Sequence, residues 1–189
     1  LFKFELPTSS PSSRYLFPAI LEAFDKTSLS PSDLESIVVG VGPGSYTGIR
    51  VGVSAVKSLS QVLEIPLVGI CSLECFLPPK EGSFVAAIDA KSGGMYSLQG
   101  EMKGGNVSYL SPPDRLNNEQ WLDVVRKTEM VITPHPQQIK EKYEKELSSL
   151  EIQWFEVGPY LQKMMPFLQQ KVAQETYDQF GEVELIYLR

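Results

Sequence analysis

The sequence predicts an α/β protein that folds into two lobes. Residues 37–57 join a β-branched strand, a Gly-Pro-Gly turn and a helix without interruption, which is typical of an α/β unit. A similar order of strands and helices occurs on both sides of a linker, Leu-Pro-Pro-Lys-Glu-Gly, at residues 77–82. With 189 residues and 42% hydrophobic content, the chain can bury one sizeable core or two small ones. We therefore expect an amino-terminal lobe over residues 1–78 and a carboxy-terminal lobe over residues 79–189.

The amino-terminal half contains three predicted strands and two predicted helices. Alternating and β-branched apolar residues predict strands over residues 1–6, 37–41 and 67–71. Apolar residues near a 3.6-residue period predict helices over residues 13–26 and 46–64.

The carboxy-terminal half contains more strands. Alternation and turn residues predict strands over 84–89, 95–101, 106–110, 130–133 and 152–157, helices over 117–127, 136–147 and 159–172, and an extended end over 184–189. The two halves have the same order if the first has lost two leading strands, which indicates a structural repeat. We expect those two strands to be missing, since the chain opens on a strand without an initiator Met.

One face of the helix over residues 46–64 carries almost no side chain. Gly48, Gly52 and Ala55 lie at positions i, i+4 and i+7 of this helix. Each glycine costs about 1 kcal/mol relative to alanine in an exposed helix, so a bare face needs a reason. We expect another helix or a ligand to approach this face closely.

The Gly-Pro-Gly loop at residues 42–44 has two interpretations. A helix amino terminus attracts anions, so the loop can hold a phosphate. It matches neither G-x-x-x-x-G-K-[ST] nor G-x-G-x-x-G, which favours a tight turn followed by a close-packed helix. Asp89 ends a predicted strand and also has two interpretations. A carboxylate at this position can hold a metal ion or a water molecule, or it can cap the glycine turn that follows the strand. The candidate nucleotide-proximal residues are Gly42, Gly44, Ser45, Thr47, Arg50 and Asp89.

Composition excludes several kinds of chemistry. The net charge is −6 and no run of Lys or Arg exceeds two, so the chain has no basic footprint for binding nucleic acid by itself. Cys71 and Cys75 are expected to be reduced structural thiols, and His135, the single histidine, to be structural. These residues assemble neither a zinc hydrolase nor a cysteine nucleophile, so we expect no catalytic and no metal-binding residue. We see no membrane span and no signal peptide, and expect a cytoplasmic protein.

The loop and helix at residues 42–52, G-P-G-S-Y-T-G-I-R-V-G, resemble a family signature. It is the G-R-G-P-G-S-[FY]-T-G-[IVL]-R-x-G motif of the TsaB (YeaZ) family, which is filed historically with glycoprotease-like proteins (peptidase M22). Four other segments agree with this family: residues 14–21, 68–74, 87–96 and 184–189.

The resemblance implies an actin/Hsp70/sugar-kinase-like (ASKHA, ribonuclease H-like) fold of two lobes, with the first lobe lacking its two leading strands here. It also implies a noncatalytic scaffold in bacterial synthesis of N6-threonylcarbamoyladenosine at position 37 of tRNAs that read ANN codons. The expected partners are the larger paralogue TsaD, which carries the metal-binding histidines and transfers the group, and the ATPase TsaE. The sequence leaves open whether the chain alone is a homodimer or a monomer, and tRNA is expected to be contacted only through the complex. We expect no cofactor on this chain alone, and the sequence leaves open whether ATP or ADP lies at an interface shared with TsaD.

We expect the first and central helices to dock on the same helices of TsaD or of a second copy. The predicted interface residues are Leu16, Ala19, Ile20, Ala23, Tyr46, Gly48, Ile49, Gly52, Val53, Ala55 and Val56. The alternative is an independent nucleotide-binding enzyme of the ASKHA or glycoprotease type. It is disfavoured because Ser12, Val41, Lys91 and Gly94 stand where the family usually has His, Arg, Arg and Glu.

Overall fold

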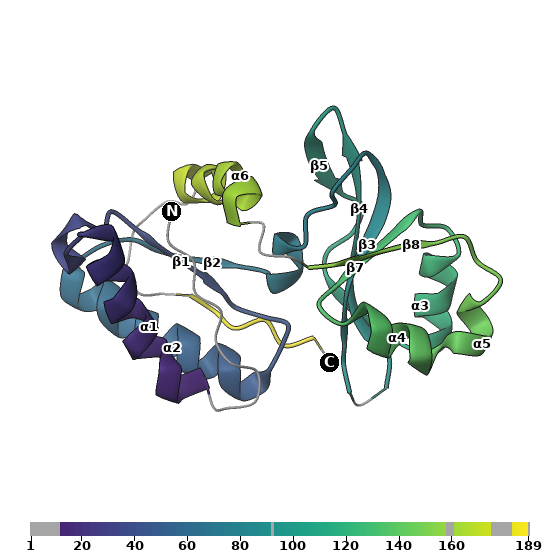
Figure 1. Cartoon of the computed structure of the whole chain (residues 1–189), viewed down its shortest axis with the longest axis horizontal. Coiled ribbons are helices and arrows are strands. Elements are labelled where there is room, and N and C mark those ends of the chain that lie inside the picture. Colours follow the sequence, from purple (N-terminus) through teal and green to yellow (C-terminus); the bar gives the residue numbers. More distant parts are fainter. Residues whose placement is uncertain (1–11, 92, 158–160, 175–182, 189) are drawn as a thin grey trace. The chain divides into compact units, whose positions relative to one another are not determined.

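The computed structural model describes residues 12–91, 93–157, 161–174 and 183–188. The strand predicted over residues 1–6 lies outside them. The chain divides into two compact units, lobe 1 and lobe 2 (Figure 1). Lobe 1 comprises Leu1–Ile70 and Leu161–Ile186, and lobe 2 comprises Cys71–Tyr160 and Tyr187–Arg189.

This division corrects the predicted boundary at residues 78 and 79. The short 3₁₀ helix η2 (Ser72–Cys75) belongs to lobe 2. Leu73 at its centre is completely buried, and the Tyr109 hydroxyl of lobe 2 donates a hydrogen bond to the Glu74 carbonyl oxygen at 3.1 Å. The last helix, α6 (Leu161–Gln174), was expected in the carboxy-terminal lobe and belongs to lobe 1.

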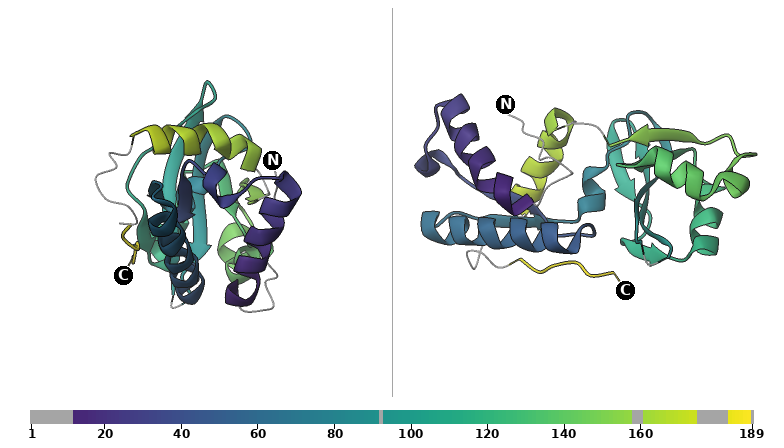
Figure 2. Two further views of the ribbon diagram at one scale, coloured as in Figure 1. Left: turned by 90° about the vertical axis from the view of Figure 1, so that its left-hand side faces the viewer. Right: turned by 60° about the horizontal axis from the view of Figure 1, so that its bottom comes forward.

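Lobe 1 is built on a pair of parallel strands. Its described elements are α1 (Ser12–Thr27), η1 (Pro31–Asp33), β1 (Ile37–Gly40), α2 (Tyr46–Leu63), β2 (Leu67–Ile70) and α6. β1 and β2 pair in register from Ile37 with Leu67 to Gly40 with Ile70. The views in Figures 1 and 2 place α1 and α2 on one side of this pair and α6 on the other.

The ends of α2 follow from local sequence. Ser45 caps its first turn, since the Ser45 hydroxyl accepts a hydrogen bond from the Gly48 amide at 3.3 Å. The helix ends at Glu64, which adopts a left-handed conformation (φ 53°), and Pro66 prevents its continuation. The buried Ser60 hydroxyl donates to the Ile65 carbonyl oxygen at 2.6 Å, which fixes the turn into β2.

A segment near the carboxyl terminus returns to lobe 1 and runs beside the end of β1. The Ile186 amide donates to the Val41 carbonyl oxygen at 2.9 Å. Gly42 has φ +111°, and a Cβ there would lie 2.8 Å from the Ile186 carbonyl oxygen. Glycine is therefore required at position 42, both for its backbone conformation and for this close approach.

Lobe 2 contains a six-stranded mixed sheet. Its elements after η2 are β3 (Gly82–Asp89), β4 (Met95–Lys103), β5 (Asn106–Tyr109), β6 (Asp114–Leu116), α3 (Asn118–Val125), β7 (Met130–Thr133), α4 (Pro136–Lys142), α5 (Glu144–Leu147) and β8 (Gln153–Glu156). The strand order is β5-β4-β3-β7-β8, with β6 also paired to β4. β3, β4 and β5 are antiparallel neighbours, whereas β7 and β8 run parallel to β3 and to each other.

Helices α3, α4 and α5 pack on one face of this sheet. The buried core between them comprises Val85, Ala87, Met95, Trp121, Leu122, Val125, Val131, Ile139, Tyr143 and Leu147. The Trp121 and Tyr143 rings lie 4.8 Å apart between centroids.

The single helix predicted over residues 136–147 is instead two helices, α4 and α5. The backbone leaves the helical conformation at Tyr143 (φ −122°, ψ 29°). There the Tyr143 ring enters the core against Trp121, and its hydroxyl donates to Asn118 Oδ1 at 2.7 Å. The short elements η2 and β6 were not predicted, because each has at most four residues and shows no periodicity.

Candidate functional site

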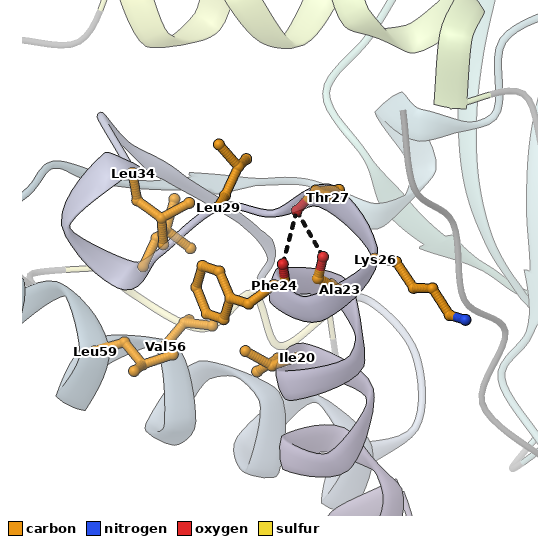
Figure 3. A pocket seen from close by; sticks show the side chains of 10 residues that line it. Ile20, Ala23, Phe24, Lys26, Thr27, Leu29, Leu34, Val56 and Leu59 are labelled. Atoms are coloured by element: carbon orange, nitrogen blue, oxygen red, sulfur yellow. Dashed lines mark hydrogen bonds between the residues drawn. The ribbon is translucent and has the colours of Figure 1, made fainter.

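An apolar groove of about 800 Å³ lies in lobe 1 between α1 and α2 (Figure 3). It is lined by Ile20, Ala23, Phe24, Lys26, Thr27, Leu29, Leu34, Ile37, Val56 and Leu59. Figure 3 shows Ile20 and Phe24 of α1 pointing toward Val56 and Leu59 of α2. The Thr27 hydroxyl bonds back to the carbonyl oxygens of Ala23 (2.6 Å) and Phe24 (3.4 Å), so the polar end of α1 is satisfied locally.

Large apolar side chains are exposed on both helices. On α1, Phe17 is 49% exposed and Leu21, one turn later, is 67% exposed. On α2, Tyr46 is 58% and Val62 is 81% exposed. Contiguous exposed apolar side chains mark interaction surfaces, and Phe17 and Leu21 lie one turn apart on α1, whereas Tyr46 and Val62 lie at opposite ends of α2.

The bare face of α2 is open at its centre. A Cβ at Gly52 would meet nothing within 4 Å, and one at Gly48 would meet only Ser45 of the same helix start. In the described residues, therefore, no other helix approaches Gly52 closely. The space that the glycine leaves is available to another molecule.

The predicted interface residues divide by burial. Tyr46 is exposed, and most of the others are partly exposed: Leu16, Ala19, Ile20, Ala23, Gly48, Ile49, Gly52 and Val56. Val53 and Ala55 are only 5% and 9% exposed, and α2 packs on β1 and β2. The expectation that these two side chains help to form a docking surface is corrected by their burial. Phe17, Leu21 and Val62 were missed, although the spacing of Phe17 and Leu21 by one helical turn was visible in the sequence.

The Gly-Pro-Gly loop forms a capped helix start. Gly44, Ser45 and Thr47 are exposed, whereas Gly42 is buried beneath the returning carboxyl-terminal segment. The Arg50 guanidinium lies 4.4 Å from the centre of the Tyr46 ring, a cation–π contact. Contact with a nucleotide stays a prediction for these residues.

Asp89 belongs to lobe 2, not to the lobe that holds the loop. Its Oδ1 accepts hydrogen bonds from the Lys142 ammonium and from the Lys91 amide, both at 2.9 Å. Burial raises the pKa of the Asp89 carboxyl, but these hydrogen bonds lower it more, so its pKa lies below the ordinary value. The side chain thus forms an ion pair with α4 and fixes the turn after β3, as the capping interpretation predicts.

The remaining candidates take structural positions. His135 is exposed at the start of α4, and its amide donates to the Thr133 hydroxyl at 3.3 Å. Cys71 is buried and Cys75 partly buried, and both are thiols. Across the described ranges, no three His, Cys, Asp or Glu side chains gather as metal ligands. In the same part of the chain, no helix is long and apolar enough to span a membrane.

The sequence also matches a known protein family. Residues 8–179 match the family model described as TsaD: tRNA N6-adenosine threonylcarbamoyltransferase. The chain belongs to this family. The match covers most of both lobes.

Relatives within the family carry the TsaB name. The chain is 32% identical over 112 residues to the tRNA threonylcarbamoyladenosine biosynthesis protein TsaB of Bacillus subtilis, covering 58% of this chain and 49% of that protein. It is 32% identical over 98 residues to the Escherichia coli TsaB, covering 49% and 42%. These matches confirm the resemblance to TsaB (YeaZ). The chain spans about half the length of the curated relatives it matches.

Solved structures show the same fold. YeaZ from Pseudomonas aeruginosa superposes with a TM-score of 0.74 at 17% identity, covering 98% of this chain and 88% of that one. A Pseudomonas aeruginosa protein described as similar to peptidase YEAZ superposes with a TM-score of 0.71 at 16% identity, covering 93% and 83%. The predicted ASKHA-like α/β fold is confirmed.

Proposed function

We propose that this chain is a noncatalytic subunit that acts with TsaD in the synthesis of N6-threonylcarbamoyladenosine in tRNA. Its membership of the threonylcarbamoyltransferase family and its relatives named TsaB support this role. One relative is itself a tRNA N6-adenosine threonylcarbamoyltransferase, that of Trichlorobacter lovleyi, at 40% identity over 57 residues, covering 30% of this chain and 17% of that protein.

The observation that carries the proposal is the open surface of α1 and α2. Phe17, Leu21 and Val62 are exposed apolar side chains, and their burial is worth about 25 cal/mol for each Å² removed from water. Gly52 adds a position where a partner helix can approach the α2 backbone, since a Cβ there meets no other described residue within 4 Å. We assign this surface to TsaD and, in its absence, to a second copy of this chain.

The ion pair of Asp89 supports a noncatalytic role. A carboxylate at the end of β3 is placed to hold a metal ion or a water molecule, but Lys142 already neutralises it at 2.9 Å. We place any ATP or ADP at the interface shared with TsaD, near Arg50, rather than on this chain alone.

Two substitutions of Gly52 test the docking surface. Gly52→Ala adds only a Cβ into open space and is expected to stabilise the helix by about 0.5–1 kcal/mol while leaving assembly with TsaD intact. Gly52→Leu is expected to fold as well but to prevent close approach and so abolish the complex. Size-exclusion chromatography with light scattering, with and without TsaD of the same organism, measures both. Assembly of Gly52→Leu at wild-type strength in both cases contradicts the docking surface.

The function itself is tested by modification of tRNA. TsaD and the other pathway components are expected to form N6-threonylcarbamoyladenosine only when this chain is present. Modification at full rate without it rules the proposal out. Calorimetry with ATP tests the alternative of an independent enzyme, since tight binding to this chain alone contradicts a scaffold that lacks a complete nucleotide site.

A further inference from the structure

A second hollow, of about 380 Å³ and lined by both apolar and polar residues, lies in lobe 2, at the edge of the sheet. It is lined by Ser97, Gln99, Ser111, Pro112, Pro113, Asp114 and Leu116. Its volume falls within the range of about 300–1,000 Å³ that holds small molecules in proteins. None of these residues belongs to the surface of α1 and α2.

An irregularity in strand pairing creates this hollow. β5 and β6 both pair with β4, with Tyr109 opposite Gly100 and Asp114 opposite Ser97. Two residues of β4, 98 and 99, thus face four residues, 110–113. The extra residues bulge away from the sheet, and Pro112 and Pro113 have no N–H groups with which to restore the pairing.

The strand register shows which side chains share the hollow. Side chains alternate along β4, so Met95, Ser97 and Gln99 lie on one face of the sheet. Asp114 is directly opposite Ser97, and its side chain lies on the same face. Met95 is part of the core under α3, so one face of β4 passes from the apolar core at Met95 to the hollow at Ser97 and Gln99.

Ser97 lacks a hydrogen-bond partner. Its side chain is 3% exposed, and its Oγ is inaccessible to solvent and bonds to no group in the described part of the chain. A buried hydroxyl without a hydrogen-bond partner destabilises the folded state. A guest with a polar atom in the hollow removes this cost when the Ser97 side chain turns so that its hydroxyl reaches the hollow, because a hydroxyl both donates and accepts.

We propose that this hollow binds a small organic cation with several N–H donors, such as a guanidinium on a short alkyl chain. Asp114 is the charged residue among those lining it, and its carboxylate favours cations and repels phosphates and carboxylates. Ser97, Ser111 and Gln99 add acceptor oxygens for further N–H groups. Pro112, Pro113 and Leu116 supply apolar contact for the alkyl chain. The site is independent of the proposed docking on TsaD.

Agmatine, a guanidinium and an ammonium on a short chain, is the probe. Calorimetry and amide NMR on the full chain are expected to show saturable binding with shifts at Ser97, Gln99 and Asp114. Neutral butylurea keeps the alkyl chain and part of the N–H groups but has no positive charge, and it is expected to bind at least about tenfold more weakly, since charge-assisted hydrogen bonds are worth about 1.5–3 kcal/mol.

Matched variants assign the binding to the hollow. Asp114→Asn keeps the shape and is expected to weaken agmatine binding about tenfold or more, whereas Glu144→Gln removes the same charge from an exposed position of α5 and is expected to leave it unchanged. Ser97→Ala is expected to weaken binding a few-fold without lowering the melting temperature. The absence of saturable binding, equal effects of Asp114→Asn and Glu144→Gln, or equal affinity for butylurea overturns the proposal.

Discussion

Asp89 shows how neighbouring groups decide the role of a single carboxylate. Its position at the end of β3 is as predicted, and the sequence left open whether it holds a ligand or caps a turn. Lys142, which forms the ion pair, lies 53 residues later in the sequence. The pattern around Asp89 therefore contained no information about this partner, whereas the bond from the Lys91 amide is local and was predictable from the glycine turn.

The ion pair gives lobe 2 a specific dependence on pH. The pKa of Asp89 lies below its ordinary value. Its contribution to the free energy of unfolding is therefore present when the pH is above the unfolded-state pKa of about 4, and it is lost as the pH falls through the folded-state pKa. Burial lowers the pKa of Lys142, but its bond with Asp89 raises it more. The contribution of Lys142 to the free energy of unfolding is present when the pH is below the unfolded-state pKa of about 10, and it is lost as the pH rises through the folded-state pKa.

Lys142→Met is therefore expected to lower the free energy of unfolding at neutral pH by no more than about 1 kcal/mol, since both side chains are about one-third exposed. The difference from wild type is expected to shrink at acidic pH, where Asp89 is protonated. Urea denaturation at the two pH values measures this. Lys145→Met, an exposed lysine of α5, serves as the control, and an equal loss from Lys142→Met at both pH values argues against the ion pair.

At the scale of elements, helices with local signals were predicted well. α3 begins one residue after Asn117, as the capping pattern indicates, and α2 matches its predicted range within one residue. The helix over residues 136–147 was predicted too long, because the position of Tyr143 is set by Trp121 and Asn118 in the core. The hollow at Ser97 was also missed, since it arises from a bulge between strands rather than from a motif.

The cap of α3 makes a direct test of local stabilisation. The Asn117 side chain accepts from the Gln120 amide at 2.9 Å, and the Gln120 side chain accepts from the Asn117 amide at 3.0 Å. Asn117→Ala is expected to lower the free energy of unfolding by about 1 kcal/mol, and Asn117→Ser to restore most of it. Chemical denaturation measures both. A serine variant as unstable as the alanine variant speaks against capping as the cause.

At the scale of the whole molecule, lobe 1 is discontinuous in sequence. Its two strands come from residues 37–70, whereas α6 and the segment that ends at Ile186 come from the far end of the chain. The two-lobed organisation was predictable from the order of elements. The correct boundary was not, because the contact between Ile186 and Val41 joins residues that no local pattern connects.

Removal of residues 183–189 is expected to loosen lobe 1 selectively. The Val41 carbonyl loses the Ile186 amide, and the Val183 side chain, which would lie 3.2 Å from a Cβ at Gly69, no longer covers this position of β2. Hydrogen exchange measured by mass spectrometry is expected to quicken in β1 and β2 and to stay unchanged in β3 and β7, whose residues are among the most buried. Equal quickening in both lobes contradicts a local role for the segment.

The return of the chain to lobe 1 affects how the protein folds during translation. Proteins generally fold from the amino terminus as they are made. Here the ribosome completes β3 to β8 of lobe 2 before it adds the residues that close Gly42 and β1 of lobe 1. Lobe 1, whose strands are synthesised first, is therefore the last lobe to be completed. During translation its apolar helices are present before the segment that ends at Ile186 has been synthesised.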